Sequence, residues 1–102
     1  MEPGTSAAPS PGFVYLLRCR DLSFYVGTSD DVAARVETHN AGSGPDYTPR
    51  RRPVRLLHQE EHPDRASARR REIEIKGWRR EKKLAWAQGL AHPRALPRLR
   101  DR

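Results

Sequence analysis

The apolar residues near the start of the chain fall into two short runs that are typical of β-strands. Residues 13–20 are rich in β-branched, aromatic and bulky apolar side chains, and residues 23–28 form a second run of this kind. Only a polar break that begins at Asp21 separates the two runs, and such close spacing indicates a hairpin. We therefore predict two paired strands at the start of the folded unit.

A short helix is predicted after the hairpin. Residues 29–31 (Ser-Asp-Asp) offer three possible N-caps, and their acidic charge suits the positive end of a helix dipole. Val32 and Val36, with alanines between them, supply the apolar side of a helix that stops near Gly42. Residues 42–53 then read as a polar loop containing glycine and proline, which separates this helix from the next apolar run.

The second half of the chain predicts one more strand and two more helices. Residues 54–59 read as a third strand, and the His-Pro-Asp break at residues 62–64 ends it and caps a helix over residues 65–78. A third helix follows over residues 80–88. The order β-β-α-β-α-α contains a hairpin, which disfavours a wholly parallel sheet. We expect a three-stranded antiparallel or mixed sheet flanked by helices, the α+β class.

Length and the composition of the two ends indicate one domain. The 102 residues suit a single compact unit over residues 12–89. Residues 1–11 are rich in Pro, Ser, Ala and Gly and are predicted to be a disordered lead-in, while residues 90–102 read as a loose basic tail. No charged leader precedes an apolar stretch, and no run approaches a membrane span, so we expect a cytoplasmic protein that does not enter a membrane.

Charge is the strongest signal in the composition. Lys plus Arg number 20 against 13 for Asp plus Glu, which gives a net charge of +7 and attracts polyanions such as nucleic acid. An arginine-rich composition inherited from a GC-rich genome is the alternative explanation. The mean hydropathy of −0.92 indicates a small core and favours an open groove over an enclosed cofactor cavity. The single cysteine, Cys19, excludes an intramolecular disulfide and is best explained as a buried apolar residue.

Two tyrosines and a glycine in the predicted hairpin are the first candidates for a site. Taken singly, Tyr15 and Tyr25 are each best explained as ordinary half-buried strand residues. Gly27 is more informative, because a glycine inside a strand often marks the close approach of another group. The sequence leaves the hairpin register open, and with it whether the two tyrosines share a face.

Polar residues on the predicted helices supply the other candidates. Arg35 and His39 lie four residues apart on one helical face, where Arg35 could present its guanidinium to a phosphate and His39 could accept a proton or a hydrogen bond. The alternatives are that Arg35 extends to solvent and that His39 simply suits a helix C-terminus. Glu72 lies beside an apolar stripe formed by Ala68 and Ile75, where a carboxylate needs a metal or a partner. An ion pair with Lys76 is the alternative for Glu72.

The ordered set of these residues resembles the GIY-YIG nuclease superfamily, and most of all its short, single-domain bacterial members, the UPF0213-like proteins. Each element alone is weak, but the set spans residues 13–83 in the order and spacing of that family. The elements are Phe13-Val14-Tyr15, Tyr25-Val26-Gly27, Arg35, His39-Asn40, Tyr47-Thr48 and Glu72-Ile73-Glu74-Ile75-Lys76.

The resemblance implies a three-stranded antiparallel sheet flanked by helices and divalent-metal-dependent cleavage of DNA. It makes Mg²⁺ or Mn²⁺ the expected cofactor and DNA the expected partner, with RNA as an alternative and with no protein partner indicated. Carried over position by position, the motif tyrosines would be Tyr15 and Tyr25. The catalytic arginine would be Arg35, with His39 as its neighbouring histidine, and the metal-binding glutamate would be Glu72. Gly27 and Tyr47 would line the site.

The chain departs from the family pattern in places that spare these groups. The first motif reads Phe-Val-Tyr and lacks the leading glycine, and the second reads Tyr-Val-Gly. Some relatives carry an asparagine after the glutamate, but the only asparagine here is Asn40. The expected catalytic set is therefore intact apart from that contribution.

A mechanism can be written for the set as a hypothesis. Tyr15, hydrogen-bonded to His39, would take a proton from water, while Arg35 stabilises the phosphorane and a metal on Glu72 binds the scissile phosphate. Tyr15 could act as a base only if nearby cations lowered its pKa. Basic residues around the site would contact backbone phosphates without reading sequence, so binding should depend steeply on salt and show little base specificity. These basic residues are Arg50, Arg51, Arg52, Lys76, Lys82 and Lys83. The cleavage expected of the protein is internal and selective for structure rather than sequence.

Two other functions compete with this one. The first is a non-catalytic nucleic-acid-binding module that has kept the nuclease fold. The second is a structural or interaction protein whose charge is incidental, and it predicts no retention of DNA at physiological salt.

Overall fold

The computed structural model describes residues 11–44 and 48–89. The predicted lead-in, apart from Pro11, and the predicted basic tail lie outside these residues, as does Tyr47. None of the described helices is long and apolar enough to cross a membrane. The elements, in chain order, are β2 (Gly12–Arg18), β3 (Phe24–Ser29), α1 (Val32–Asn40), the 3₁₀ turn η1 (Pro49–Arg51), β4 (Arg55–His62), α2 (Arg65–Lys76) and α3 (Arg80–Ala87).

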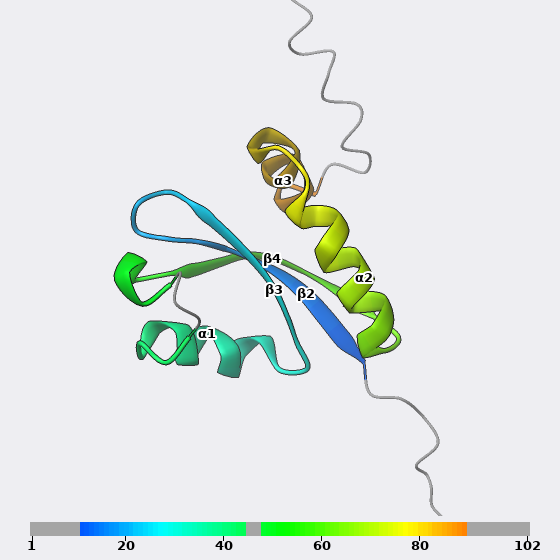
Figure 1. The fold of residues 1–102 in the computed structure, drawn as a ribbon, viewed down its shortest axis with the longest axis horizontal. Coiled ribbons are helices and arrows are strands. Elements are labelled where there is room, and N and C mark those ends of the chain that lie inside the picture. The colour runs from blue at the N-terminus through cyan, green and yellow to red at the C-terminus, as the bar shows by residue number, and fades with distance from the viewer. Residues whose placement is uncertain (1–10, 45–47, 90–102) are drawn as a thin grey trace, which may run out of the picture.

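The three strands form one antiparallel sheet with the order β3-β2-β4 (Figure 1). The α+β prediction and the β-β-α-β-α-α order of the long elements are confirmed, and the sheet is antiparallel throughout. In the hairpin, Tyr15 pairs with Gly27 and Leu17 pairs with Tyr25. Since side chains alternate between faces, Tyr15 and Tyr25 lie on the same face. The register that the sequence left open is now assigned.

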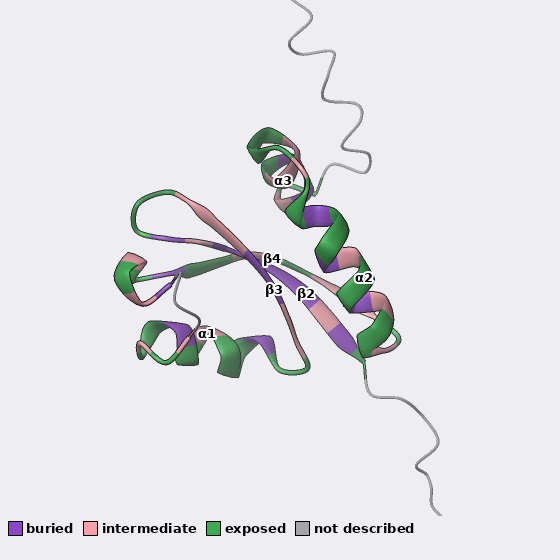
Figure 2. Cartoon of the chain, viewed as in Figure 1, coloured by how far each residue is buried: buried purple, intermediate pink, exposed green. Residues whose placement is uncertain are grey.

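The central strand β2 is buried on both faces, which explains its continuous apolar sequence (Figure 2). Val14 and Leu16 pack with residues of α2 and α3, including Ala68, Ile75 and Trp86. The intervening residues pack on the opposite face, against α1 and the start of β4. That second cluster contains Tyr15, Leu17, Cys19, Val32 and Val54.

The caps of the first two helices follow the sequence expectation. Asp31, one of the three proposed N-caps, accepts a hydrogen bond from the Ala34 amide at 3.1 Å. Asp64 accepts one from the Ser67 amide at 2.8 Å at the start of α2. The last turn of α2 differs from the prediction, because the helix ends at Lys76 with Gly77 as its C-cap rather than at residue 78.

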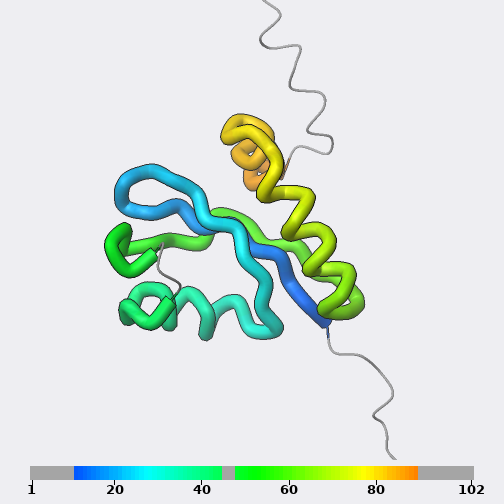
Figure 3. Tube along the Cα trace, in the orientation of Figure 1, coloured from blue at the N-terminus to red at the C-terminus, as the bar shows by residue number. Residues whose placement is uncertain are grey.

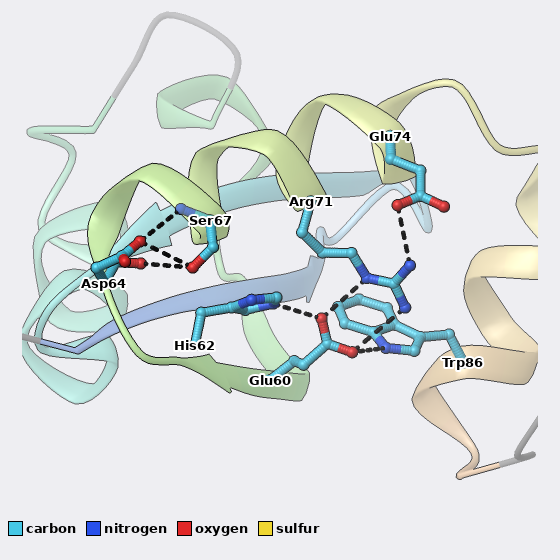
Figure 4. A network of polar contacts seen from close by, with 7 residues as sticks. All are labelled: Glu60, His62, Asp64, Ser67, Arg71, Glu74 and Trp86. Atoms are coloured by element: carbon cyan, nitrogen blue, oxygen red, sulfur yellow. Dashed lines mark hydrogen bonds and ion pairs between the residues drawn. The ribbon is translucent and has the colours of Figure 1, made fainter.

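Strand β4 begins one residue later than expected and runs three residues further, to His62. The added residues include Glu60 and Glu61, which are of a type disfavoured in strands. In the structure the Glu60 carboxylate accepts hydrogen bonds from Arg71, from His62 and from the Trp86 indole (Figure 4). Although burial opposes ionisation, these donors hold the pKa of Glu60 below its usual value. They also tie α2 and α3 to the strand.

The turn η1, which the sequence did not predict, lies beside the connection between β2 and β3 (Figure 3). The Arg20 amide donates to the Arg51 carbonyl at 2.9 Å, and the Arg51 guanidinium pairs with Asp21 at 3.0 Å. Further along, the Asn40 side chain accepts from the Val54 amide at 2.7 Å and donates to the Val54 carbonyl at 3.0 Å. The end of α1 is thereby fixed to the residue that precedes β4.

Candidate functional site

A buried chain of hydrogen bonds connects Tyr15, His39 and Thr48. The Tyr15 hydroxyl lies 3.0 Å from His39 Nε2, and His39 Nδ1 lies 2.9 Å from the Thr48 hydroxyl. All three residues are at most 1% exposed. Burial, with the charge of Arg35, lowers the pKa of His39, so the imidazole is neutral near neutral pH. In the tautomer protonated at Nδ1, Nε2 is free to accept the Tyr15 proton.

Two glycines make room for this chain. A Cβ atom at Gly27 would lie 2.5 Å from the Tyr15 hydroxyl and 2.7 Å from Cζ, so the close approach expected at Gly27 is made by the Tyr15 ring itself. A Cβ atom at Gly44 would lie 2.6 Å from His39 Nδ1 and 2.7 Å from the Thr48 hydroxyl. Sequence reasoning missed Gly44 and the part played by Thr48, although both lie in the segment after the His-Asn pair.

Tyr25 completes an aromatic cluster with Tyr15 and His39. Its ring centroid lies 5.1 Å from that of His39 and 6.3 Å from that of Tyr15. Burial raises the pKa of the Tyr25 hydroxyl. The structure therefore joins three of the four residues proposed as catalytic in one cluster on a single face of the sheet.

The pKa of Tyr15 contradicts part of the sequence-based mechanism. Cations were expected to lower it, and Arg35 does act in that direction. Burial raises the pKa of Tyr15 strongly, the neighbouring Tyr25 hydroxyl adds to the effect, and Arg35 does not offset them. The Tyr15 hydroxyl is therefore protonated in this state of the protein, and it cannot serve as a base unless its own proton leaves at the same time.

Arg35 and Glu72 approach the tyrosines from different helices. Arg35 is an exposed residue of α1, and no hydrogen bond or ion pair engages its side chain within residues 11–44 and 48–89. Glu72 lies on α2, which packs against β3, and its side chain is 11% exposed. Both charges are near enough to shift the pKa of both tyrosine hydroxyls. The four groups thus lie within electrostatic reach of one another at the β3 side of the sheet.

The ion pair offered as the alternative for Glu72 is present, and the carboxylate is also partly buried. The residue lies on the buried stripe of α2, between Ala68 and Ile75. It also forms the ion pair with Lys76, whose Nζ is 3.2 Å from Oε2, and Arg69 Nε lies 3.7 Å from Oε1. Glu72 is therefore a partly buried carboxylate already flanked by two cations.

The chemistry of this carboxylate fits a magnesium or manganese ion. Within the part of the chain that the structure describes, no three His, Cys, Asp or Glu residues converge as a metal cage would require. Mg²⁺ does not need such a cage, because it keeps several waters and is commonly held by one or two carboxylates with substrate phosphate. Glu72 is the residue that would hold it.

The basic residues proposed to contact DNA fall into two groups. Lys76 and Lys83 line a hollow with Tyr25, and burial lowers the pKa of Lys83. Lys82 lies over the Trp78 ring, with Nζ 4.7 Å from its centroid. The other group is on η1 and the residue after it, where Arg50 is exposed, Arg51 pairs with Asp21, and Arg52 donates to the Pro49 and Asn40 carbonyls.

Loss of the Thr48 hydroxyl should destabilise the fold through His39. In Thr48→Val, His39 Nδ1 stays buried without this partner, and an unsatisfied buried polar atom costs about 1–3 kcal/mol. Urea unfolding followed by circular dichroism measures the loss. Thr38→Val is the matched control, since that exposed hydroxyl donates only to the Ala34 carbonyl of its own helix. Equal losses in the two variants would contradict the assigned role of Thr48.

This combination of fold and residues is that of a known class of protein. The family model described as the GIY-YIG catalytic domain matches residues 11–85. The chain therefore belongs to the GIY-YIG nuclease family, whose substrates are nucleic acids.

Individual proteins similar to this chain narrow the family further, to its UPF0213 members. The UPF0213 protein of Staphylococcus aureus (strain Mu3) is 51% identical over 72 residues, which cover 71% of this chain and 88% of that protein. Among solved structures, the UPF0213 protein BH0048 from Bacillus halodurans is 36% identical, with a TM-score of 0.51, covering 81% of this chain and 88% of that one. The protein EF2693 from E. faecalis is 32% identical, with a TM-score of 0.56, covering 90% and 95%.

Proposed function

We propose that this protein is a divalent-metal-dependent nuclease that cleaves DNA internally and selects substrates by structure rather than base sequence. The observation that carries the proposal is the hydrogen bond between Tyr15 and His39, with Arg35 and Glu72 within electrostatic reach of the tyrosine. A hydroxyl next to a neutral imidazole can relay a proton, and a guanidinium can stabilise a phosphorane.

Because the pKa of Tyr15 is raised, Tyr15 acts as a proton relay between the attacking water and His39 rather than as a base on its own. The attacking water gives its proton to the Tyr15 oxygen while the Tyr15 hydroxyl proton passes to His39 Nε2, so that no free tyrosinate forms. His39 then carries the positive charge, which Thr48 helps to accommodate by holding the ring in place. The departing 3′ oxygen takes a proton from solvent water. Because burial of the imidazolium is unfavourable, His39 gives its proton back through Tyr15 to solvent, which balances the one taken up by the 3′ oxygen.

The remaining residues act on the phosphate. Arg35 donates to the non-bridging oxygens, where charge accumulates in the transition state. Glu72 would hold the divalent metal, whose positive charge, when bound, stabilises the phosphate and the departing 3′ oxygen. Lys76, which now pairs with Glu72, is placed to exchange that carboxylate for a backbone phosphate.

Cleavage of supercoiled plasmid is the direct test. With Mg²⁺ or Mn²⁺ present, we expect the supercoiled form to be converted to the relaxed circle, and EDTA should stop the conversion. Appearance of relaxed circles distinguishes internal cleavage from attack at ends. A panel of branched, nicked and linear substrates then measures the selectivity. If no substrate in the panel is cut with either metal, the proposal is wrong.

A non-catalytic nucleic-acid-binding module is the second candidate. Two observations favour this function. Tyr15 is 1% exposed, which limits its access to a substrate, and the Glu72 carboxylate is already paired with Lys76 and Arg69 rather than open to a metal. Salt-sensitive binding of DNA without metal-dependent cleavage of any substrate would put this function first.

A further inference from the structure

A polar cavity lies between α1 and α2, next to the proposed site. Its volume is about 320 Å³, and it is lined by Arg35 of α1, by Thr28 and the exposed Asp30 at the end of β3, and by Arg65 and Arg69 of α2. We call it the arginine cavity. Arg65 and Arg69 belong to neither the expected catalytic set nor the expected DNA contacts, so the cavity adds a feature that the sequence analysis missed.

The cavity is strongly basic, and its guanidinium groups are only partly neutralised. Arg65 pairs with Asp30 at 2.7 Å, and both side chains are at least half exposed. The partner of Arg69 is Glu72, at the longer distance of 3.7 Å, and the Arg69 side chain is 72% exposed. Arg35 has no side-chain partner within the described ranges. Three cations thus face one lining carboxylate.

The backbone explains why these arginines converge. A Cβ atom at Gly12 would lie 3.0 Å from Ala68 Cβ and 3.1 Å from Arg65 Cα, so the absence of a side chain there allows α2 to start close against β2. Arg65 and Arg69 are four residues apart and therefore share a helical face. The arginines that line the cavity therefore lie on helices, and those of α2 are held in place by its packing against β2.

The planar guanidinium groups of Arg65 and Arg69 suit a phosphate, which they can bind through paired hydrogen bonds. Arg35 lies where the cavity meets the proposed site, and in the proposed mechanism its guanidinium serves the scissile phosphate. The positions of Arg65 and Arg69 along α2 indicate which phosphate of a nucleic-acid strand they would bind. Arg65, Arg69, Glu72 and Lys76 follow one another on a single face of the helix at spacings of four, three and four residues. A nucleic-acid strand lying along this face would meet the arginine cavity directly before Glu72.

We propose that the arginine cavity binds an internal backbone phosphate adjacent to the scissile one and so sets the register of the strand at Glu72. This inference rests on the proposed function, because it takes a nucleic acid as the substrate. Asp30 opposes binding in the free protein by pairing with Arg65, and the incoming phosphate replaces it as the partner of that guanidinium.

Binding measured without metal tests the proposal separately from cleavage. Anisotropy of a fluorescein-labelled linear duplex in EDTA gives the affinity over a range of salt concentrations. Each phosphate contact contributes about 0.9 to the slope of log affinity against log salt, so Arg69→Gln should reduce the slope by about 0.9. Arg70→Gln is the matched control, since Arg70 is an exposed arginine of the same helix that does not line the cavity. Its slope should match that of the wild type.

Asp30→Asn gives an effect of opposite sign, which damage to the fold could not imitate. Removing the one lining carboxylate should tighten binding by about threefold, the effect expected of a single solvent-screened charge. Covalently closed plasmid, which has no ends, should compete with the labelled duplex, as expected for an internal phosphate.

Any one of three results would overturn the inference while the proposed function stands. The first is an equal salt dependence of binding for Arg69→Gln and Arg70→Gln. The others are weaker DNA binding by Asp30→Asn and failure of the closed plasmid to compete with the labelled duplex. Absence of both DNA binding and cleavage in the wild type would instead overturn the proposed function, and the cavity assignment with it.

Discussion

Replacing Arg35 by alanine is expected to slow cleavage of supercoiled plasmid by about 10³-fold or more, the contribution of an arginine that stabilises the charge of a phosphoryl transition state. The fold should be nearly unaffected, because the Arg35 side chain is exposed and has no partner within the described residues. Initial rates of nicking measure the first effect, and urea unfolding measures the second. Surface substitutions of this kind change stability by about 0.5 kcal/mol or less.

Two further variants make the result specific to the guanidinium. Arg35→Lys keeps the charge but loses the planar fork, so it should recover only part of the rate. Arg70→Ala removes an exposed arginine from α2, outside both the tyrosine cluster and the arginine cavity, and should cleave at nearly the wild-type rate. Arg35→Ala and Arg70→Ala cleaving equally fast would remove Arg35 from the mechanism.

Glu72→Gln is expected to lower the cleavage rate by about 10²–10³-fold, the range seen when one electrostatic stabiliser of a transition state is removed. The neutral amide is a poor ligand for Mg²⁺, so raising the metal concentration should not restore the rate. Binding of DNA in EDTA should be kept or strengthened, because removing this carboxylate frees Lys76 and Arg69 from their shared partner. A plasmid assay and an anisotropy titration on the same preparation separate these outcomes.

The matched control for Glu72 lies two residues away on the same helix. Glu74→Gln makes the same chemical change at an exposed residue that pairs with Arg71, on a different face of α2 (Figure 4). It should cleave like the wild type and bind DNA with similar affinity. Wild-type cleavage by Glu72→Gln, or an equal loss in Glu74→Gln, would contradict the proposed metal position.

Local patterns predicted the fold well where local physics determines it. Runs of β-forming residues, the caps at Asp31 and Asp64 and the hairpin spacing are properties of short segments, so the order of the long elements could be read directly. The end of β4 could not, because Glu60 is tolerated in the strand only through donors on α2 and α3 that are remote in sequence. The turn η1 was missed within a loop that gave no periodic signal.

The candidate site was predictable in its residues but not in its electrostatics. Tyr15 and His39 were expected to be hydrogen-bonded, and they are. The sequence predicted the lowering effect of Arg35 on the pKa of Tyr15 but not the net shift, because burial of the Tyr15 side chain in the folded protein exceeds the effect of one exposed arginine. Thr48 was noted only as part of a motif, since its contact with His39 joins residues nine positions apart in the sequence.

The arginine cavity could not be predicted for a similar reason. The sequence shows Arg65 and Arg69 as two members of a run of charged residues, without indicating which of them face another element. Only the approach of α2 to β2 at Gly12, a contact between distant segments, brings them beside Arg35.

Because β2 is buried on both faces, the part of the site that it carries is more rigid than the part carried by α1. The backbone of β2 is hydrogen-bonded to a strand on each side and its side chains are packed above and below, so local opening should cost most there. Tyr15 is carried by this strand, whereas Arg35 extends from the solvent-facing surface of a two-turn helix. In the proposed mechanism the Tyr15 hydroxyl would therefore be a fixed reference point, and the Arg35 guanidinium could adjust its reach to the phosphates of differently shaped nucleic acids.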